Sequence, residues 1–368
     1  MSILAALAAI AVLALLIVVH ELGHFMAARL QGIYANRFSL GFGPILWKYQ
    51  GPETEYAIRA FPLGGFVGFP DDDPDSDIPP NDPNLLRNRP ILDRAIVISA
   101  GVIANLVFAY FLLVAQIGTV GIPGFNQPGV LIPEVASKSS LVAQQAGIKP
   151  KDVILAVDGK DLGTGLQATE SLKKAIQQSP NHPLKLTIER DKQTLSVQVT
   201  PEPGQDGKGK IGVALFPNGE VVRKRAHNLV EAFTSAAEEY ERIAVLTVQG
   251  FGQLLSNFRE TADQVSGPVK IVEIGANIAR SNAADLFQFA ALISINLAII
   301  NILPLPALDG GQLAFLLIEG VRGKPLPTEV QQNIMQTGLV LLLGLGIFLI
   351  VRDTANLIPT SWVQNLFQ

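Results

Sequence analysis

The feature that most constrains this chain is an uninterrupted apolar run, residues 3–19, that leads directly into His20-Glu21-Leu22-Gly23-His24. With the helix-compatible residues that follow, the run is long enough to cross a bilayer, which takes about 20 apolar residues. Ionisable groups in such a segment cost roughly 2.5–3.5 kcal/mol each near the bilayer centre, so their presence indicates a function. We therefore predict a transmembrane helix over residues 3–28 that carries a functional site.

The order of these polar residues is typical of a metal site. On a helix, His20 and His24 project from one face, where their imidazoles can hold one metal ion. Glu21 can then lie beside a metal-bound water and accept its proton, as in zinc peptidases. An isolated match in a soluble helix is as often incidental as catalytic, but two of the four histidines of this chain occur here. We favour a catalytic metal site.

Composition agrees with a membrane protein, because hydrophobic residues make up 48% of the chain and charged residues only 16%. Soluble domains have about 25% charged residues. The net charge of −4 gives no basic signature, so no nucleic-acid partner is expected. Cysteine is absent, so a metal site must use His, Asp or Glu. The N-terminal run lacks the basic start and the cleavage site of a secretory signal, which favours a retained span.

The expected fold class is a multi-pass α-helical membrane protein with a membrane-associated β-hairpin and an inserted α+β domain. Its four expected spans are residues 3–28, 94–118, 286–308 and 334–352. Lys and Arg gather between the first two spans and between the last two, which places both of these loops in the cytosol and the segment between spans two and three outside.

Residues 218–285 are expected to form amphipathic or interfacial helices. The uncharged stretch 243–258 within them is short for a span, so we predict that it does not cross the bilayer. The first and third spans then run in the same direction, which brings Asp309 to the depth of His20. A fifth span would place these two residues on opposite sides.

Two alternating runs across a Gly51-Pro52 turn predict a β-hairpin over residues 37–69. The second half, which contains Gly64 and Gly65, is too apolar for a solvated loop. Two interpretations stay open: an ordinary cytosolic hairpin, or a re-entrant hairpin that offers a strand edge to a substrate. Residues 71–83 form an acidic, proline-rich linker that is expected to be solvated.

Residues 125–217 are polar, with strand-like runs and one helical stretch, and predict a separate domain on the outer side. Within them, Ala146-Gly147-Ile148, then Asp152 and Ile154, then an Asp158-Gly159 turn are similar to the signature of bacterial PDZ domains. PDZ domains bind extended peptides by strand addition. The resemblance implies that the domain binds a peptide or a substrate ectodomain, or filters substrates by size; a purely structural cap is the alternative.

A third ligand is expected near the end of the third span, since a catalytic zinc site needs three protein ligands. Pro304 and Pro306 cannot stay in a regular helix. Broken backbone at membrane depth is tolerated only where it is buried in protein or lines a wet cavity. Asp309 follows this break and is the strongest candidate, although an Asp-Gly turn at an interface is the alternative. In the second span, Asn105 needs a polar partner and serves either helix packing or a contact near the site.

Together, the motif His20-Glu21-Leu22-Gly23-His24, the element Gly41-Phe42-Gly43-Pro44, the PDZ-like region, Ser266-Gly267-Pro268 and the stretch Asn301 to Gly310 resemble the site-2 protease family of intramembrane zinc metalloproteases. The nearest group is the bacterial branch that acts in regulated intramembrane proteolysis. The resemblance implies that His20, His24 and Asp309 bind Zn²⁺ and that Glu21 is the catalytic acid/base. It also places Asn296 and Asn301 near bound substrate. Further candidates for substrate binding are Asn105, Gly64 and Gly65.

The expected function is hydrolysis of peptide bonds in or near the transmembrane segment of single-span membrane proteins. The expected place is the bacterial inner membrane, with the active site toward the cytosol and the PDZ domain outside. Two other classes are a non-catalytic membrane scaffold that presents the PDZ domain and a metal transporter. Transporters usually contain internal repeats, and none is apparent here.

Overall fold

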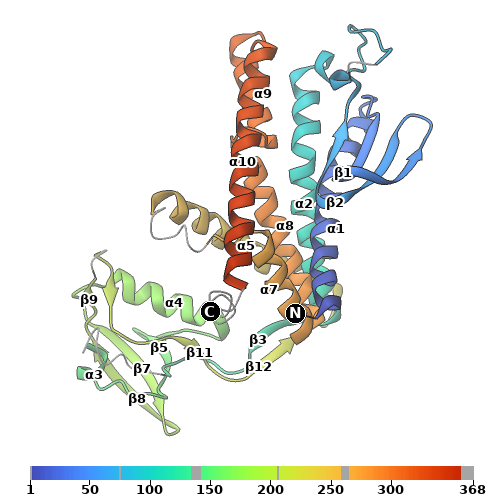
Figure 1. Ribbon diagram of the computed structural model, residues 1–368. Coiled ribbons are helices and arrows are strands. Elements are labelled where there is room, and N and C mark those ends of the chain that lie inside the picture. Colours follow the sequence, from blue (N-terminus) through green and yellow to red (C-terminus); the bar gives the residue numbers. More distant parts are fainter. Residues whose placement is uncertain (1, 74–75, 134–141, 205–206, 258–264, 358–368) are drawn as a thin grey trace, which may run out of the picture. The chain divides into compact units, whose positions relative to one another are not determined.

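The computed structural model describes residues 2–73, 76–133, 142–204, 207–257 and 265–357 (Figure 1). The chain divides into two compact units. A helical unit comprises Met1–Thr119 and Ala226–Gln368, and a β-rich unit comprises Val120–Arg225.

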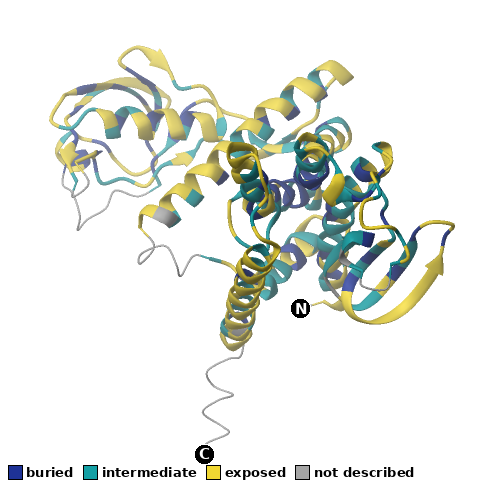
Figure 2. Ribbon diagram, turned by 90° about the horizontal axis from the view of Figure 1, so that it is seen from above, coloured by how far each residue is buried: buried dark blue, intermediate teal, exposed yellow. Residues whose placement is uncertain are grey.

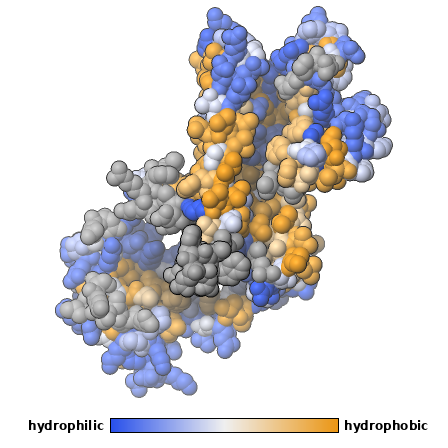
Figure 3. All heavy atoms as spheres, in the orientation of Figure 1, coloured by the Kyte–Doolittle hydropathy of each residue, from blue (hydrophilic) through white to orange (hydrophobic). Residues whose placement is uncertain are grey.

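Within the described residues of the helical unit, four helices are long and apolar enough to cross a membrane. They are α1 (Ile3–Leu30), α2 (Ile91–Thr119), α8 (Leu286–Ile302, preceded by the 3₁₀ turn Ala283–Asp285) and α10 (Thr328–Leu357). The other helices of this unit are α5 (Leu229–Ser256), α7 (Pro268–Ser281) and α9 (Asp309–Arg322). Figure 3 shows apolar side chains gathered along the middle of the long helices, as contact with lipid requires.

Helix α2 packs against α1, α8, α5 and α9. Small residues permit the close approach of α1, because a Cβ on Gly23 would lie 2.7 Å from the Cβ of Ala104. Buried residues concentrate where these helices meet, whereas α10 is mostly exposed (Figure 2). In the most apolar 18 residues of each helix, only 6% of α10 is buried, against 33% of α2, so α10 is the most exposed of the four helices.

The third expected span ends earlier than the sequence predicted. Helix α8 stops at Ile302 rather than at residue 308, and Asp309 is the first residue of α9. Pro304 has no backbone N–H to continue the hydrogen-bonded ladder. Ala307 takes a positive φ of 68°, which reverses the chain before α9 begins. The predicted break is therefore present, but it separates two helices instead of ending one.

The predicted hairpin exists as β1 (Arg37–Gln50) and β2 (Glu55–Gly68), but it is more than two paired strands. The segment 37–40 pairs in parallel with 55–58 on one side and antiparallel with 65–68 on the other, while 45–50 pairs antiparallel with 55–59. The four segments thus form a small sheet in the order 45–50, 55–59, 37–40, 65–68. Gly41 permits the fold-back: its φ is +85°, and a Cβ there would lie 2.6 Å from the Phe61 carbonyl oxygen.

The acidic stretch after the sheet makes specific contacts at its described residues. Asp71 accepts hydrogen bonds from the backbone N–H groups of Leu86 and Arg87, at 3.1 and 2.9 Å. Asp73 accepts one from Arg37 at 2.8 Å. The stretch was expected to be a solvated linker, but at least these two carboxylates bind it to β1 and to the segment before α2.

The stretch 243–258 forms, as far as Ser256, the second half of α5 and does not qualify as a span by length and composition. Helix α5 begins at Asn228, whose side chain accepts from the Glu231 N–H. It is attached to α2 by a 3.0 Å hydrogen bond from the Tyr110 hydroxyl to the Phe233 carbonyl oxygen. It also contacts α8, where the Gln288 amide donates to Glu239 at 2.7 Å.

The β-rich unit contains a sheet of strand order β11-β4-β5-β7-β8, with β6 paired to β5. Its elements are β3 (Ile122–Phe125), β4 (Val130–Leu131), α3 (Val142–Gln145), β5 (Val153–Val157), β6 (Lys160–Asp161), α4 (Gly165–Gln178), β7 (Leu184–Arg190), β8 (Gln193–Val199), β9 (Glu202–Pro203), β10 (Gly209–Lys210), β11 (Phe216–Pro217) and β12 (Val221–Lys224). The unit is longer at both ends than the predicted 125–217, because β3 pairs antiparallel with β12. Its core contains the fully buried residues Ile154, Leu172 and Leu186.

Candidate metal centre

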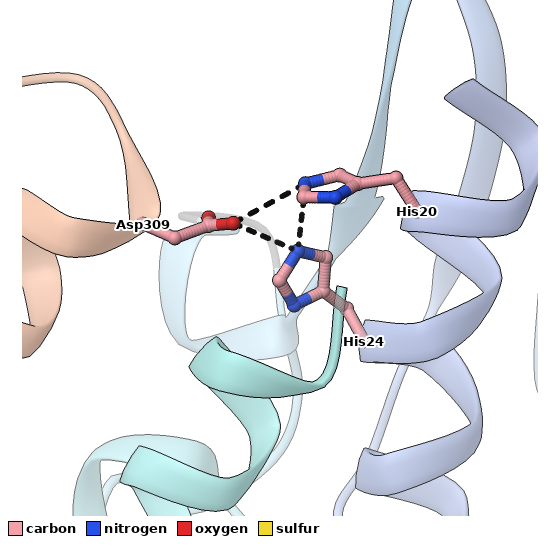
Figure 4. Close-up of side chains that lie close together, drawn as sticks. All are labelled: His20, His24 and Asp309. Carbon is pink, nitrogen blue, oxygen red and sulfur yellow. Dashed lines mark hydrogen bonds and ion pairs between the residues drawn. The ribbon is translucent and has the colours of Figure 1, made fainter. Parts of the chain in front are cut away.

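Three side chains from two distant parts of the chain converge in the helical unit (Figure 4). Nε2 of His20 lies 3.2 Å from Oδ2 of Asp309, and Nε2 of His24 lies 3.4 Å from the same oxygen. The two Nε2 atoms are 3.2 Å apart. The side chains of His20, His24 and Asp309 are only 10%, 12% and 15% exposed. The structure therefore brings together the three residues that the sequence selected as metal ligands.

The arrangement fits a metal ion better than a set of hydrogen bonds. Nδ1 of His24 donates to the Val97 carbonyl oxygen at 2.8 Å, which leaves the lone pair of Nε2 facing the other two atoms. Oδ2 of Asp309 is buried and accepts no hydrogen bond from any described residue. Lone pairs that face each other repel unless a cation lies between them. Ligand atoms bound at about 2.0–2.1 Å in a tetrahedron lie roughly 3.3–3.4 Å apart, which matches this spacing.

A glycine of α2 makes room for the two imidazoles. A Cβ on Gly101 would overlap Nε2 of His24 and lie 2.8 Å from Cε1 of His20. Gly101 is a site residue that the sequence alone did not indicate. The available signal was a small residue one turn before the polar Asn105 of the same span.

The non-helical stretch 303–308 between α8 and α9 positions Asp309. The two residues after it, Gly310 and Gly311, pack so closely on this stretch that a Cβ on either would overlap a carbonyl oxygen, of Leu303 or Leu305 respectively. The two glycines let α9 start directly at the carboxylate that is the candidate third metal ligand.

Glu21 lies between the three candidate ligands and the sheet. Its carboxylate accepts a hydrogen bond from the backbone of Val67. A Cβ on Gly65 would lie 2.9 Å from Cγ of Glu21 and 3.0 Å from the Ser39 carbonyl oxygen. The edge segment 65–68 of the sheet therefore lies against the proposed acid/base.

The remaining candidates fall into two groups. Nδ2 of Asn301 lies 3.3 Å from Nε2 of His20, and Nδ2 of Asn105 lies 3.4 Å from Nδ1 of the same ring. Gly64 contacts the Phe42 ring and has a φ of +130°, so it shapes the sheet. Asn296 makes none of the described hydrogen bonds to the three ligands.

Comparisons with known proteins give a consistent result. The model of peptidase family M50 matches residues 8–345. A protein of Nostoc sp. named "Putative zinc metalloprotease" is 68% identical over 363 residues, 98% of this chain and 99% of the relative. The chloroplastic membrane metalloprotease ARASP of Arabidopsis thaliana is 51% identical over 354 residues, 95% of this chain and 79% of the relative. A solved PDZ domain of an SdrC-like protein from Listeria monocytogenes covers 24% of this chain at 14% identity, with a TM-score of 0.21 that is too low to define a fold.

Proposed function

Because this chain belongs to peptidase family M50, the site-2 protease family, we propose that it is a zinc metalloprotease that cleaves membrane proteins in or near their transmembrane segments. The observation that carries the proposal is the convergence of His20, His24 and Asp309 beside Glu21. These are the groups that hydrolysis of a peptide bond requires: three ligands with an open fourth position and one proton acceptor.

Each residue has a distinct role in this proposal. His20, His24 and Asp309 would hold Zn²⁺, which would supply a Lewis acid for activating water and for stabilising negative charge on the carbonyl oxygen. Glu21 accepts the proton of the attacking water and returns it to the leaving amine nitrogen. In this proposal the Asn301 amide, whose Nδ2 lies 3.3 Å from Nε2 of His20, donates to the substrate carbonyl oxygen.

The sheet is proposed to hold the substrate in an extended form. Hydrolysis needs an extended backbone, because a helix hides its peptide bonds in internal hydrogen bonds. In the described pairings, residues 65–68 form an edge of the sheet. They pair with 37–40 on one side, and Glu21 lies on the other side. A substrate strand that adds to this edge would present its backbone to Glu21. Of the two interpretations of the hairpin, this geometry favours the re-entrant one.

The four apolar helices are proposed to cross the membrane. In a bacterial host this is the inner membrane, with the β-rich unit on the outer side and the active site toward the cytosol. The PDZ-like signature of the β-rich unit suggests that it binds a peptide or the ectodomain of a substrate.

The test is cleavage of a co-expressed single-span membrane protein, with zinc content measured on the purified enzyme. Glu21→Gln keeps the shape of the side chain but removes its basicity, so we expect no cleavage and unchanged zinc content. Full activity of this variant would refute the role of Glu21. Wild-type protein that binds zinc stoichiometrically but cleaves no test substrate would favour the scaffold. Zinc flux into proteoliposomes would favour the transporter.

A further inference from the structure

The polar environment of His20 differs from that of His24 in one respect that matters for metal binding. A neutral imidazole carries one N–H and one lone pair, so it binds a metal through Nε2 only if the proton is on Nδ1. For His24, the Val97 carbonyl oxygen accepts the Nδ1–H at 2.8 Å and fixes this form. For His20, the group facing Nδ1 is the side-chain amide of Asn105.

Asn105 is completely buried, and its amide nitrogen lies 3.4 Å from Nδ1 of His20. Its Oδ1 is buried and accepts no hydrogen bond from any described residue. A half-turn about the last side-chain bond exchanges the amide oxygen and nitrogen within the same volume. Oδ1 then faces Nδ1 of His20 and accepts a hydrogen bond from the Nδ1–H, so the unpartnered acceptor gains a donor.

We propose that Asn105 is a positioning residue that holds His20 in the tautomer with the proton on Nδ1 and thereby keeps the lone pair of Nε2 for the metal. This inference rests on the proposed metal centre. It assigns Asn105 to the far side of the imidazole, whereas Asn301 contacts the Nε2 side that faces the metal and the substrate.

One face of α2 positions both histidines. Val97, Gly101 and Asn105 follow each other at intervals of four and so lie along one side of the helix. The Val97 carbonyl oxygen accepts from His24, and Gly101 leaves space for both imidazole rings. The Asn105 side-chain amide faces Nδ1 of His20. Ser294 of α8 is also fully buried and donates to the backbone oxygen of Asn105 at 2.8 Å, which fixes α2 at this turn.

The predicted effect is on metal affinity rather than on the shape of the substrate site. Loss of the hydrogen bond that orients a metal-binding histidine typically weakens metal affinity by 10–100-fold. Asn105→Leu keeps the number and branching of the side-chain heavy atoms but has no acceptor, and it should show this loss. Asn105→Asp keeps an acceptor and has no donor, so it should retain zinc affinity close to wild type. If the amide acted instead as a donor to His20, the Asp variant would be as defective as the Leu variant.

The experiment is competition for zinc with a chelator, on purified full-length protein in detergent, for wild type and both variants. Gln116→Leu is the matched control, because Gln116 is also a fully buried amide of α2 and makes no described side-chain hydrogen bond. It should bind zinc as wild type does. The inference fails if Asn105→Leu binds zinc with wild-type affinity, or if folded Asn105→Asp loses as much affinity as Asn105→Leu.

A second measurement does not depend on how well the Leu variant folds. The chain has four histidines, so ¹⁵N-labelled imidazoles can be resolved by NMR. In metal-free wild type, the His20 ring should show the proton on Nδ1, and the same signature should persist in Asn105→Asp. A His20 ring protonated on Nε2 in wild type would overturn the inference. If wild-type protein binds no zinc at all, the proposed metal centre itself is wrong.

Discussion

Gly101 of α2 lies directly against His24 of α1, so closely that a single methyl group on Gly101 would overlap Nε2, the ring nitrogen that faces Asp309. The neighbouring atoms on this side are the two imidazoles, not the end of a flexible chain. The geometry of the candidate metal centre therefore depends on how closely α1 and α2 pack.

Gly101→Ala should therefore disturb zinc binding. We expect a loss of zinc affinity of at least 10-fold, because both imidazoles must move to admit the methyl group. Chelator competition measures this loss. Gly250→Ala is the control: apart from the backbone of α5 itself, no described residue has an atom within 4 Å of its would-be Cβ, and alanine there should add about 0.5–1 kcal/mol of helix stability. Unchanged zinc affinity in Gly101→Ala would show that the helices separate at little cost.

Gly65→Ala should separate catalysis from metal binding. The new Cβ would lie 2.9 Å from Cγ of Glu21, so either the edge segment or the Glu21 side chain must shift. A misplacement of about 1 Å can cost 10²-fold in rate. We expect cleavage to fall by about this factor while zinc content stays at the wild-type level. A parallel loss of zinc would mean that the sheet supports the ligands themselves.

The metal motif of α1 was predictable because its information is local. His20, Glu21 and His24 occupy successive turns of one helix, and the apolar run before them fixes that helix. Pro304 and Pro306 likewise predict a break in the helix, because proline cannot continue its hydrogen bonds. The position of Asp309 as the first residue of α9 was not predictable, since it depends on how the chain turns after the break.

The sheet shows the opposite case. Alternation and the Gly51-Pro52 turn predict two strands, but the segment 37–40 has two partners, 55–58 and 65–68. Tertiary packing decides which segments pair, and the alternation of apolar and polar residues does not report it. The same holds for Gly101: its sequence context indicates close helix packing, but only the structure shows that the neighbours are imidazoles.

Asp353 should stabilise the start of α7. Its Oδ2 accepts from the Lys270 N–H at 3.0 Å, within the first turn of that helix. Gly267 leaves room for this carboxylate, because a Cβ there would lie 2.5 Å from the same oxygen. Asp353→Ala removes a cap of the kind that contributes about 0.5–2 kcal/mol, and should lower the Tm in detergent. Gln332→Ala, at an exposed position of α10, should not.

Asp152 should make the stability of the β-rich unit sensitive to acid. Its side chain is fully buried and accepts two 2.7 Å hydrogen bonds from Arg190 and one of 2.8 Å from the Lys149 N–H. Burial opposes ionisation, but these donors outweigh it and hold the pKa of the Asp152 carboxyl below its ordinary value. The stabilisation is therefore complete above the unfolded pKa of about 3.9 and is lost as the pH falls through the lower, folded value.

Hydrogen exchange of β5 and β7 in the full-length protein, followed from neutral pH into this acid range, measures the effect once the intrinsic exchange rate is corrected for. Protection should decrease with acid in wild type. Asp152→Asn removes the charge, so at neutral pH it should lower the free energy of unfolding by about 1.5–3 kcal/mol, the contribution of a charged hydrogen bond. Its protection should also depend less on acid. Equal acid dependence in both proteins would show that another carboxylate controls unfolding.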